Sequence, residues 1–124
     1  MVEDNSTSMS SSNQPAGTGR KYRLIAGHQV LFDEEDFFWH PGDWREDIAE
    51  ALARECGLAC LSAEHWKVIR FLRDFYFQNG RAPLNRQLVQ GTEMSMLAIE
   101  ALFPGGIKRG ARRIAGLPNP KACL

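Results

Sequence analysis

The chain has 124 residues, of which 15 are basic and 15 acidic, so its formal net charge at neutral pH is zero. This length suffices for one modest domain with a hydrophobic core. Its three cysteines cannot all pair with one another, which excludes a disulfide framework and leaves at least one free thiol.

Residues 1–20 differ in composition from the rest of the chain. They are rich in Ser, Thr, Asn and Gly and have hardly any apolar side chains, so we expect a disordered N-terminal tail. The tail also lacks the apolar run of a signal peptide or a membrane span. We therefore expect a cytoplasmic protein whose folded part begins near residue 21.

A small β-hairpin is predicted at the start of the folded part, where residues 22–26 and 28–32 flank Gly27. Two strands alone are only marginally stable, so this hairpin has to pack on helices. Residues 33–40 are expected to form the loop that leads to the first helix.

The first helix is predicted to begin with Asp43 as its N-cap and to run to about Cys56, with Gly57 as its end. Apolar side chains recur at every fourth residue from Trp44 to Cys56, which is the spacing of one helix face. We expect this face to pack on the core.

The second helix is predicted to open at Ser62 and to end at Gly80. Its side chains divide into an apolar stripe and a polar face. The stripe is expected to be buried and consists of Trp66, Ile69, Leu72, Phe75 and Tyr76. The polar face is expected to point mostly to water and consists of Lys67, Arg70, Arg73 and Asp74.

Three shorter helices are predicted after it, over residues 84–89, 93–102 and 107–115. Thr92 is the expected cap of the middle one, and Gly116 closes the last. The predicted fold class is therefore mainly α with a small N-terminal β-hairpin (α+β), a compact helical bundle over residues 21–115.

The remaining residues, 116–124, are predicted to form a flexible C-terminal arm. Pro118 and Pro120 lack a backbone N–H and have a fixed φ, so they stiffen this stretch and keep it out of a helix. The arm is expected to point outward with Cys123 near its tip. A thiol needed only for packing would hardly lie there.

The charges are segregated along the chain. Residues 33–64 contain ten acidic and two basic side chains, whereas residues 104–124 contain five basic side chains and no acidic one. Two interpretations stay open: the two segments attract each other within the fold, or the basic one surrounds the arm and steers acidic partners or RNA toward the thiol.

Cys56 and Cys60 lie in an apolar stretch and are interpreted as small buried hydrophobic residues. A metal site built from them with His65 and Cys123 matches no familiar zinc spacing, so we expect neither a metal nor another cofactor. His28, His40 and His65 are scattered along the chain and are interpreted as structural.

Four stretches of the chain line up, in order, with one known family. They are residues 61–76, Leu102-Phe103-Pro104, residues 111–118, and the ending with Pro120 and Cys123. Over about residues 22–124 the chain thus resembles the DsrC/TusE family of small sulfur-trafficking proteins.

The resemblance implies that Cys123 carries sulfur as a persulfide or joins a transient trisulfide. The DsrC branch has a second arm cysteine at the position that is Arg112 here, so the intramolecular bridge of that branch cannot form on this arm. The one-cysteine pattern resembles TusE, which receives sulfur from TusBCD and presents it to the thiouridylase MnmA for tRNA 2-thiolation.

The chain departs from the family pattern in two places. Asn119 lies between the two prolines where the family usually has Lys, and the stretch 90–101 looks shorter than usual. Both departures alter the docking surface. The resemblance therefore leaves several sulfur donors open (TusBCD/DsrEFH-like or TusA-like) and two kinds of acceptor, an MnmA-like protein or a sulfur-metabolism enzyme. No membrane partner is expected, and the protein alone is expected to be a monomer.

Two further functions stay open. The helices over residues 63–78 and 84–90 could imitate a helix-turn-helix that reads bases with Asn85, Arg86 and Gln87, although the zero net charge and the short second helix speak against nucleic acid. The other is a regulatory member of the family with a redox-sensing Cys123.

The sequence thus predicts a sulfurtransferase-type carrier, and no set of paired carboxylates or Ser/His/Asp suggests an enzyme acting on a substrate of its own. Cys123 is the expected nucleophile, because a thiolate attacks the outer sulfur of a donor. Lys121, Arg112 and Arg113 favour the thiolate, whereas the terminal carboxylate on Leu124 opposes it, so the sequence leaves the pKa of this thiol open. The residues expected to form the arm and to dock partners are Arg112, Arg113, Gly116, Leu117, Pro118, Pro120 and Lys121.

Overall fold

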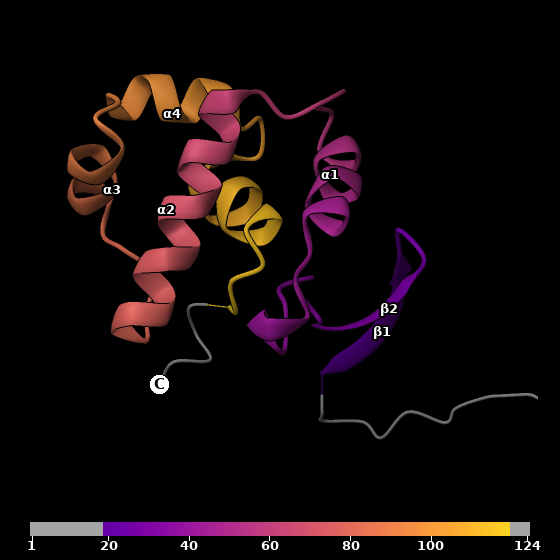
Figure 1. The fold of residues 1–124 in the computed structure, drawn as a ribbon. Coiled ribbons are helices and arrows are strands. Elements are labelled where there is room, and N and C mark those ends of the chain that lie inside the picture. The colour runs from indigo at the N-terminus through magenta and orange to yellow at the C-terminus, as the bar shows by residue number, and fades with distance from the viewer. Residues whose placement is uncertain (1–18, 120–124) are drawn as a thin grey trace, which may run out of the picture.

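The computed structural model describes residues 19–119. The predicted fold class is confirmed, because an N-terminal hairpin precedes a set of helices (Figure 1). The elements are β1 (Arg20–Ile25), β2 (His28–Asp33), the 3-10 turn η1 (Pro41–Asp43), α1 (Glu46–Glu55), α2 (Ala63–Asn79), α3 (Asn85–Thr92), α4 (Met96–Leu102) and the π-helical segment η2 (Ile107–Arg112). Residues 1–18, which are most of the predicted N-terminal tail, lie outside the described residues. So do residues 120–124 of the predicted arm, which include Pro120, Lys121 and Cys123.

The hairpin is antiparallel, and its register runs from Arg20 opposite Asp33 to Ile25 opposite His28. Ala26 and Gly27 connect the strands with φ of 52° and 82°. Two positive φ angles in a two-residue loop give the turn whose twist matches that of the strands. A local glycine signal therefore suffices to place this hairpin.

The acidic loop after β2 is a tight turn. Asp33 accepts hydrogen bonds at Oδ1 from the backbone N–H of Glu35 (2.9 Å) and of Phe37 (3.0 Å). Phe38 then forms a β-bridge with Phe32. The turn thereby presents the side chains after Asp33 to the C-terminal part of the chain.

The first helix begins later than predicted. Asp43 lies in η1 and does not cap α1, whose N-cap is Arg45 without a side-chain hydrogen bond. Trp44 precedes the helix, and its indole N–H donates to Ile114 O. The apolar spacing continues past the true start of the helix because Trp44 packs against the core although it lies before the helix.

The boundary between the third and fourth helices was also predicted wrongly. Thr92 does not cap a following helix but ends α3, where its hydroxyl donates to Leu88 O at 2.7 Å. Ser95 is the cap of α4, and its Oγ accepts from Ala98 N at 3.1 Å. A β-branched hydroxyl can serve either role, and the sequence alone does not distinguish them.

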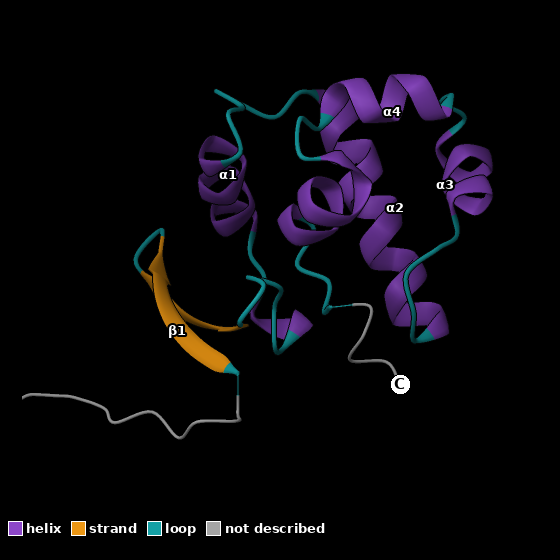
Figure 2. Ribbon diagram, turned by 180° about the vertical axis from the view of Figure 1, so that it is seen from behind, coloured by secondary structure: helices purple, strands orange, loops and turns teal. Residues whose placement is uncertain are grey.

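Helix α2 is the centre of the molecule and contacts α3, α4 and η2, whereas α1 contacts β1. Figure 2, seen from behind, shows the hairpin and α1 on one side of α2 and α3 on the other. The predicted cap is confirmed: Ser62 Oγ accepts from His65 N, and Ser62 N donates to His65 Nδ1 at 3.0 Å. The other ring nitrogen, His65 Nε2, donates to Leu102 O at 2.7 Å and so ties α2 to the end of α4.

The core combines apolar side chains from the hairpin and from every helix. Its largest fully buried members include Phe32, Phe38, Ile48, Leu72, Leu88, Ile99 and Ile114. Within α2 the stripe turns slightly from the predicted one, because Val68 is buried whereas Trp66, Phe75 and Tyr76 are only partly covered. Arg73, expected to face water, is half-buried instead.

Candidate functional site

The last helical segment ends at Gly116, as predicted. Its φ of 76° lies in the left-handed region, Gly116 N donates to Arg113 O (3.0 Å), and Leu117 N donates to Arg112 O (3.1 Å). This pair of hydrogen bonds is a Schellman motif. A β-carbon at Gly116 would overlap the indole of Trp44, so both the backbone angle and the available space require glycine.

Two side chains from distant parts of the chain cover the last free carbonyls of that helix. Trp44 Nε1 donates to Ile114 O at 2.7 Å, and Arg73 Nη1 donates to Ala115 O at 2.9 Å. The Arg73 guanidinium also lies 4.2 Å from the centre of the Trp44 ring. Because these groups satisfy backbone acceptors at the helix end, they fix the direction in which the chain leaves it.

The first residues of the segment predicted to project are packed against the body. Leu117 is 1% exposed, and Asn119 is 7% exposed and donates from Nδ2 to Glu35 Oε1 at 2.9 Å. An apolar side chain and an amide that finds a carboxylate hold this stretch down, in contrast to the outward direction expected from Gly116. The predicted site residues further along, Pro120, Lys121 and Cys123, lie outside the described residues.

Pro118 is partly exposed and lies between two clefts, which share Tyr76 as a second wall. The larger, of about 420 Å³, is bounded by the acidic turn and by residues Trp39 and Pro41. The smaller, of about 220 Å³, lies against the loop between α2 and α3 and is bounded by Arg81, Ala82, Pro83, Leu84, Arg112 and Leu117. The base of the arm is thus a ridge with a hollow on each side.

Two consecutive arginines, both expected to form the docking surface, point in different directions. Arg113 donates from Nε to Asp36 O (3.0 Å) and from Nη1 to Arg109 O (3.3 Å). Arg112 donates from Nη2 to Pro83 O (3.2 Å), while its buried Nε has no hydrogen-bond partner among residues 19–119. Burial lowers the pKa of Arg112 below its ordinary value because water no longer stabilises the charge.

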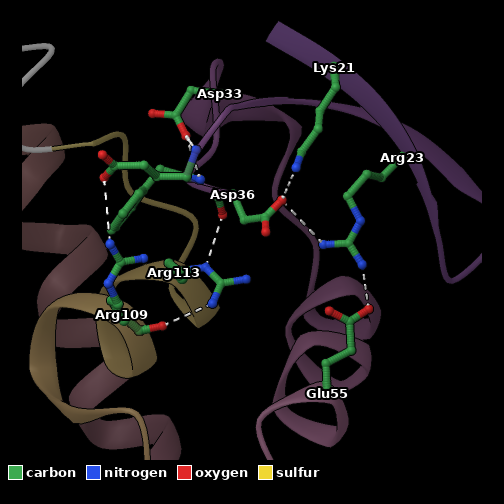
Figure 3. A network of polar contacts seen from close by, with 9 residues as sticks. Lys21, Arg23, Asp33, Asp36, Glu55, Arg109 and Arg113 are labelled. Atoms are coloured by element: carbon green, nitrogen blue, oxygen red, sulfur yellow. Dashed lines mark hydrogen bonds and ion pairs between the residues drawn. The ribbon is translucent and has the colours of Figure 1, made fainter. Parts of the chain in front are cut away.

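The acidic turn and the basic segment meet within the fold (Figure 3). Arg109 Nη2 lies 4.0 Å from Glu35 Oε1, and Arg113 reaches the backbone of Asp36. From the hairpin, Lys21 Nζ lies 3.0 Å from Asp36 Oδ1, an ionic contact that is not aligned as a hydrogen bond. Arg23 lies 3.8 Å from the same oxygen and 2.6 Å from Glu55 Oε2. Attraction between the two segments, one of the two interpretations of the charge pattern, is therefore present.

The two described cysteines differ from each other. Cys56 is partly buried at the end of α1, and burial raises the pKa of its thiol while the charge of Arg113 acts against this. Cys60 is exposed, so its interpretation as a buried residue is wrong. Among residues 19–119 no group of three or more His, Cys, Asp or Glu side chains could hold a metal ion.

One of the three side chains that could read bases is engaged in a contact within the chain. Gln87 Oε1 accepts from Leu84 N at 2.8 Å, so this side chain caps the start of α3. Asn85 and Arg86 are exposed. In the part of the chain that the structure describes, no helix is long and apolar enough to cross a membrane.

Sequence reasoning missed the residues that shape this site from elsewhere in the chain: Glu35, Trp44, Arg73, Tyr76 and Arg81. For Trp44 the available signal is that a covered indole N–H needs an acceptor, which does not say where in the chain that acceptor lies.

Comparison with known proteins finds one matching family and several similar chains. The family model described as DsrC like protein matches residues 24–124. The dissimilatory-type sulfite reductase gamma subunit of Nitratidesulfovibrio vulgaris is 37% identical over 98 residues, 79% of this chain and 93% of that one. Sulfurtransferase TusE of Escherichia coli K12 is 35% identical over 108 residues, 82% and 98% of the two chains. The crystal structure of the oxidized gamma subunit (DsrC) from Archaeoglobus fulgidus matches with a TM-score of 0.72 and 37% identity, covering 84% of this chain and all of that one.

Proposed function

This chain belongs to the DsrC-like protein family, and on that premise we propose that it is a sulfur carrier that accepts sulfur as a persulfide on Cys123 and passes it to a partner protein. The observation that carries the proposal is the family match, which extends over residues 24–124 and so includes Cys123. Relatives named sulfurtransferase and sulfite reductase subunit support a role in sulfur transfer.

The proposed chemistry is thiol exchange without net oxidation. The Cys123 thiolate attacks the outer sulfur of a donor persulfide, a new S–S bond forms on Cys123, and the donor's own S–S bond breaks to release its thiolate. In the second step an acceptor nucleophile attacks the outer sulfur of Cys123 and regenerates the Cys123 thiolate. Neither step needs a cofactor.

The geometry at the base of the arm suits this task. Trp44 and Arg73 hold the carbonyls before Gly116, and Asn119 is held by Glu35. A chain that leaves the body from an ordered base loses less conformational entropy when its end enters a narrow partner pocket. The thiol is thereby presented from one fixed point on the surface.

Arg112 favours a carrier over a disulfide cycle on the arm. It occupies the position at which the DsrC branch resembled by this chain has its second cysteine. The proposed donors are therefore TusBCD/DsrEFH-like or TusA-like proteins, and the proposed acceptors are an MnmA-like thiouridylase or a sulfur-metabolism enzyme. The partly exposed ridge at Pro118 is the proposed docking surface for these partners.

The proposal is tested by mass spectrometry after incubation with a persulfidated donor protein. A Cys56→Ala/Cys60→Ser variant leaves Cys123 as the sole thiol, and it is expected to gain the mass of one sulfur atom that a reductant removes. Adding Cys123→Ser should abolish the gain and leave the fold intact. A folded protein that gains no sulfur from several donors, or one that still gains it without Cys123, would refute the proposal.

A further inference from the structure

Two arginines, Arg81 and Arg112, line the smaller cleft beside Pro118. Arg81 stacks over the ring of Phe75 at 5.4 Å, and Arg112 donates to Pro83 O. Neither forms an ion pair with a carboxylate of residues 19–119. By contrast, Arg23 pairs with Glu55. Arg112 is half-buried, and a half-buried cation without an anion is costly, so this cleft suits an anionic group, which the exposed Arg81 at its rim would also attract.

The walls of the cleft restrict which anion fits. Apart from the two arginines and Tyr76, they consist of Ala82, Pro83, Leu84, Leu117 and Pro118. A mostly apolar hollow of about 220 Å³ is a poor site for a small, strongly hydrated anion. It suits a short side chain whose charge resides on a large, soft atom, because guanidinium is itself weakly hydrated.

The chain carries such a group within reach. Pro118 lines the cleft, and Cys123 lies five residues further along. Five residues span up to roughly 17 Å when extended. A persulfide anion on Cys123 has its charge on the outer sulfur of a short side chain, which matches the size and chemistry of the cleft.

We propose that this cleft is the resting site of the sulfur-loaded Cys123, where Arg81 and Arg112 pair with the persulfide and the apolar walls exclude water and small nucleophiles. A partner that engages the arm draws Cys123 out and exposes its outer sulfur. The inference rests on the proposed function, since the occupant exists only if Cys123 is loaded.

Cyanide tests the resting site directly. It attacks the outer sulfur of a persulfide, the S–S bond breaks, and thiocyanate and the Cys123 thiolate are formed. The loaded Cys56→Ala/Cys60→Ser protein serves as parent, and the rate of thiocyanate release is measured. Additional Arg81→Gln or Arg112→Gln is expected to raise that rate several-fold. Arg86→Gln is the matched control, because Arg86 is an exposed cation on α3 that does not line the cleft, and its rate should equal the parent's.

The direction of the change in the rate of thiocyanate release distinguishes a sheltered persulfide from an exposed one near two cations. Two arginines near an exposed persulfide would attract the cyanide anion, so removing them would slow the release. Equal or slower release in Arg81→Gln, whose exposed side chain can be replaced without disturbing the core, overturns the resting site even if Arg112→Gln fails to fold. A cleft that instead binds an acidic partner would give unchanged cyanide rates and slower transfer to an acceptor, which also overturns it. A parent that takes up no sulfur refutes the proposed function itself.

Discussion

The two sides of the C-terminal helical segment use the same residue type in opposite ways. On one side, Arg109 and Arg113 contact the acidic turn and contribute to holding the hairpin end of the molecule to its helices. On the other, Arg112 faces the loop after α2 with a single carbonyl partner. A run of basic residues therefore divides into side chains that hold the fold together and side chains that lack a counter-charge among the described residues. The charge without a counter-charge is the better indicator of a binding site.

The largest effect is expected where both sides depend on one residue, the helix end at Gly116. Gly116→Ala should lower the free energy of unfolding by about 2–4 kcal/mol, because a left-handed backbone angle is combined with overlap against Trp44. Gly80→Ala is the matched control: its φ is also 76°, but no atom of the described residues lies within 4 Å of an added β-carbon, so about 1 kcal/mol is expected. Urea unfolding measures both. Equal losses would mean that the contact with Trp44 contributes nothing.

A smaller effect should separate the two sides. Arg113→Gln is expected to cost about 1–2 kcal/mol of unfolding free energy, since it removes charge-assisted hydrogen bonds to Asp36 O and Arg109 O. Arg112→Gln should change it by less than about 0.5 kcal/mol, because relief of an uncompensated, half-buried charge offsets the lost hydrogen bond to Pro83 O. Paired urea titrations check the difference. A larger loss for Arg112→Gln would reverse the assignment of structural and uncompensated sides.

The smallest effect concerns the thiol next to the structural side. Burial raises the pKa of Cys56, so at neutral pH it should react with an alkylating reagent more slowly than the exposed Cys60. Arg113 opposes this shift, so Arg113→Gln should slow Cys56 further. Since the neutral thiol is favoured in the folded state, its contribution to stability is present below the ordinary thiol pKa of about 8.5 and is lost as the pH rises through the folded value. Peptide mass spectrometry over a pH series gives both rates, and a Cys56 as reactive as Cys60 would contradict the prediction.

Much of the fold was predictable because its signals are local. Gly27 between two apolar runs, Ser62 before a helix, and glycines at positions 80 and 116 each act on neighbouring residues, and all four predictions are confirmed. The errors at Asp43 and Thr92 arose where several neighbouring residues could cap, and packing chose among them.

The sequence by itself determined the fold class, the family resemblance and the presence of a thiol beyond a proline-rich stretch. The tertiary structure alone decided what surrounds the base of the arm. Trp44 and Ile114 are 70 positions apart, Arg73 and Ala115 are 42, and Glu35 and Asn119 are 84. No periodicity or spacing rule links residues so distant, because their contact depends on how whole elements pack. The same packing turned Arg113 toward Asp36 O and placed Arg112 beside an apolar cleft, where no carboxylate of residues 19–119 pairs with it.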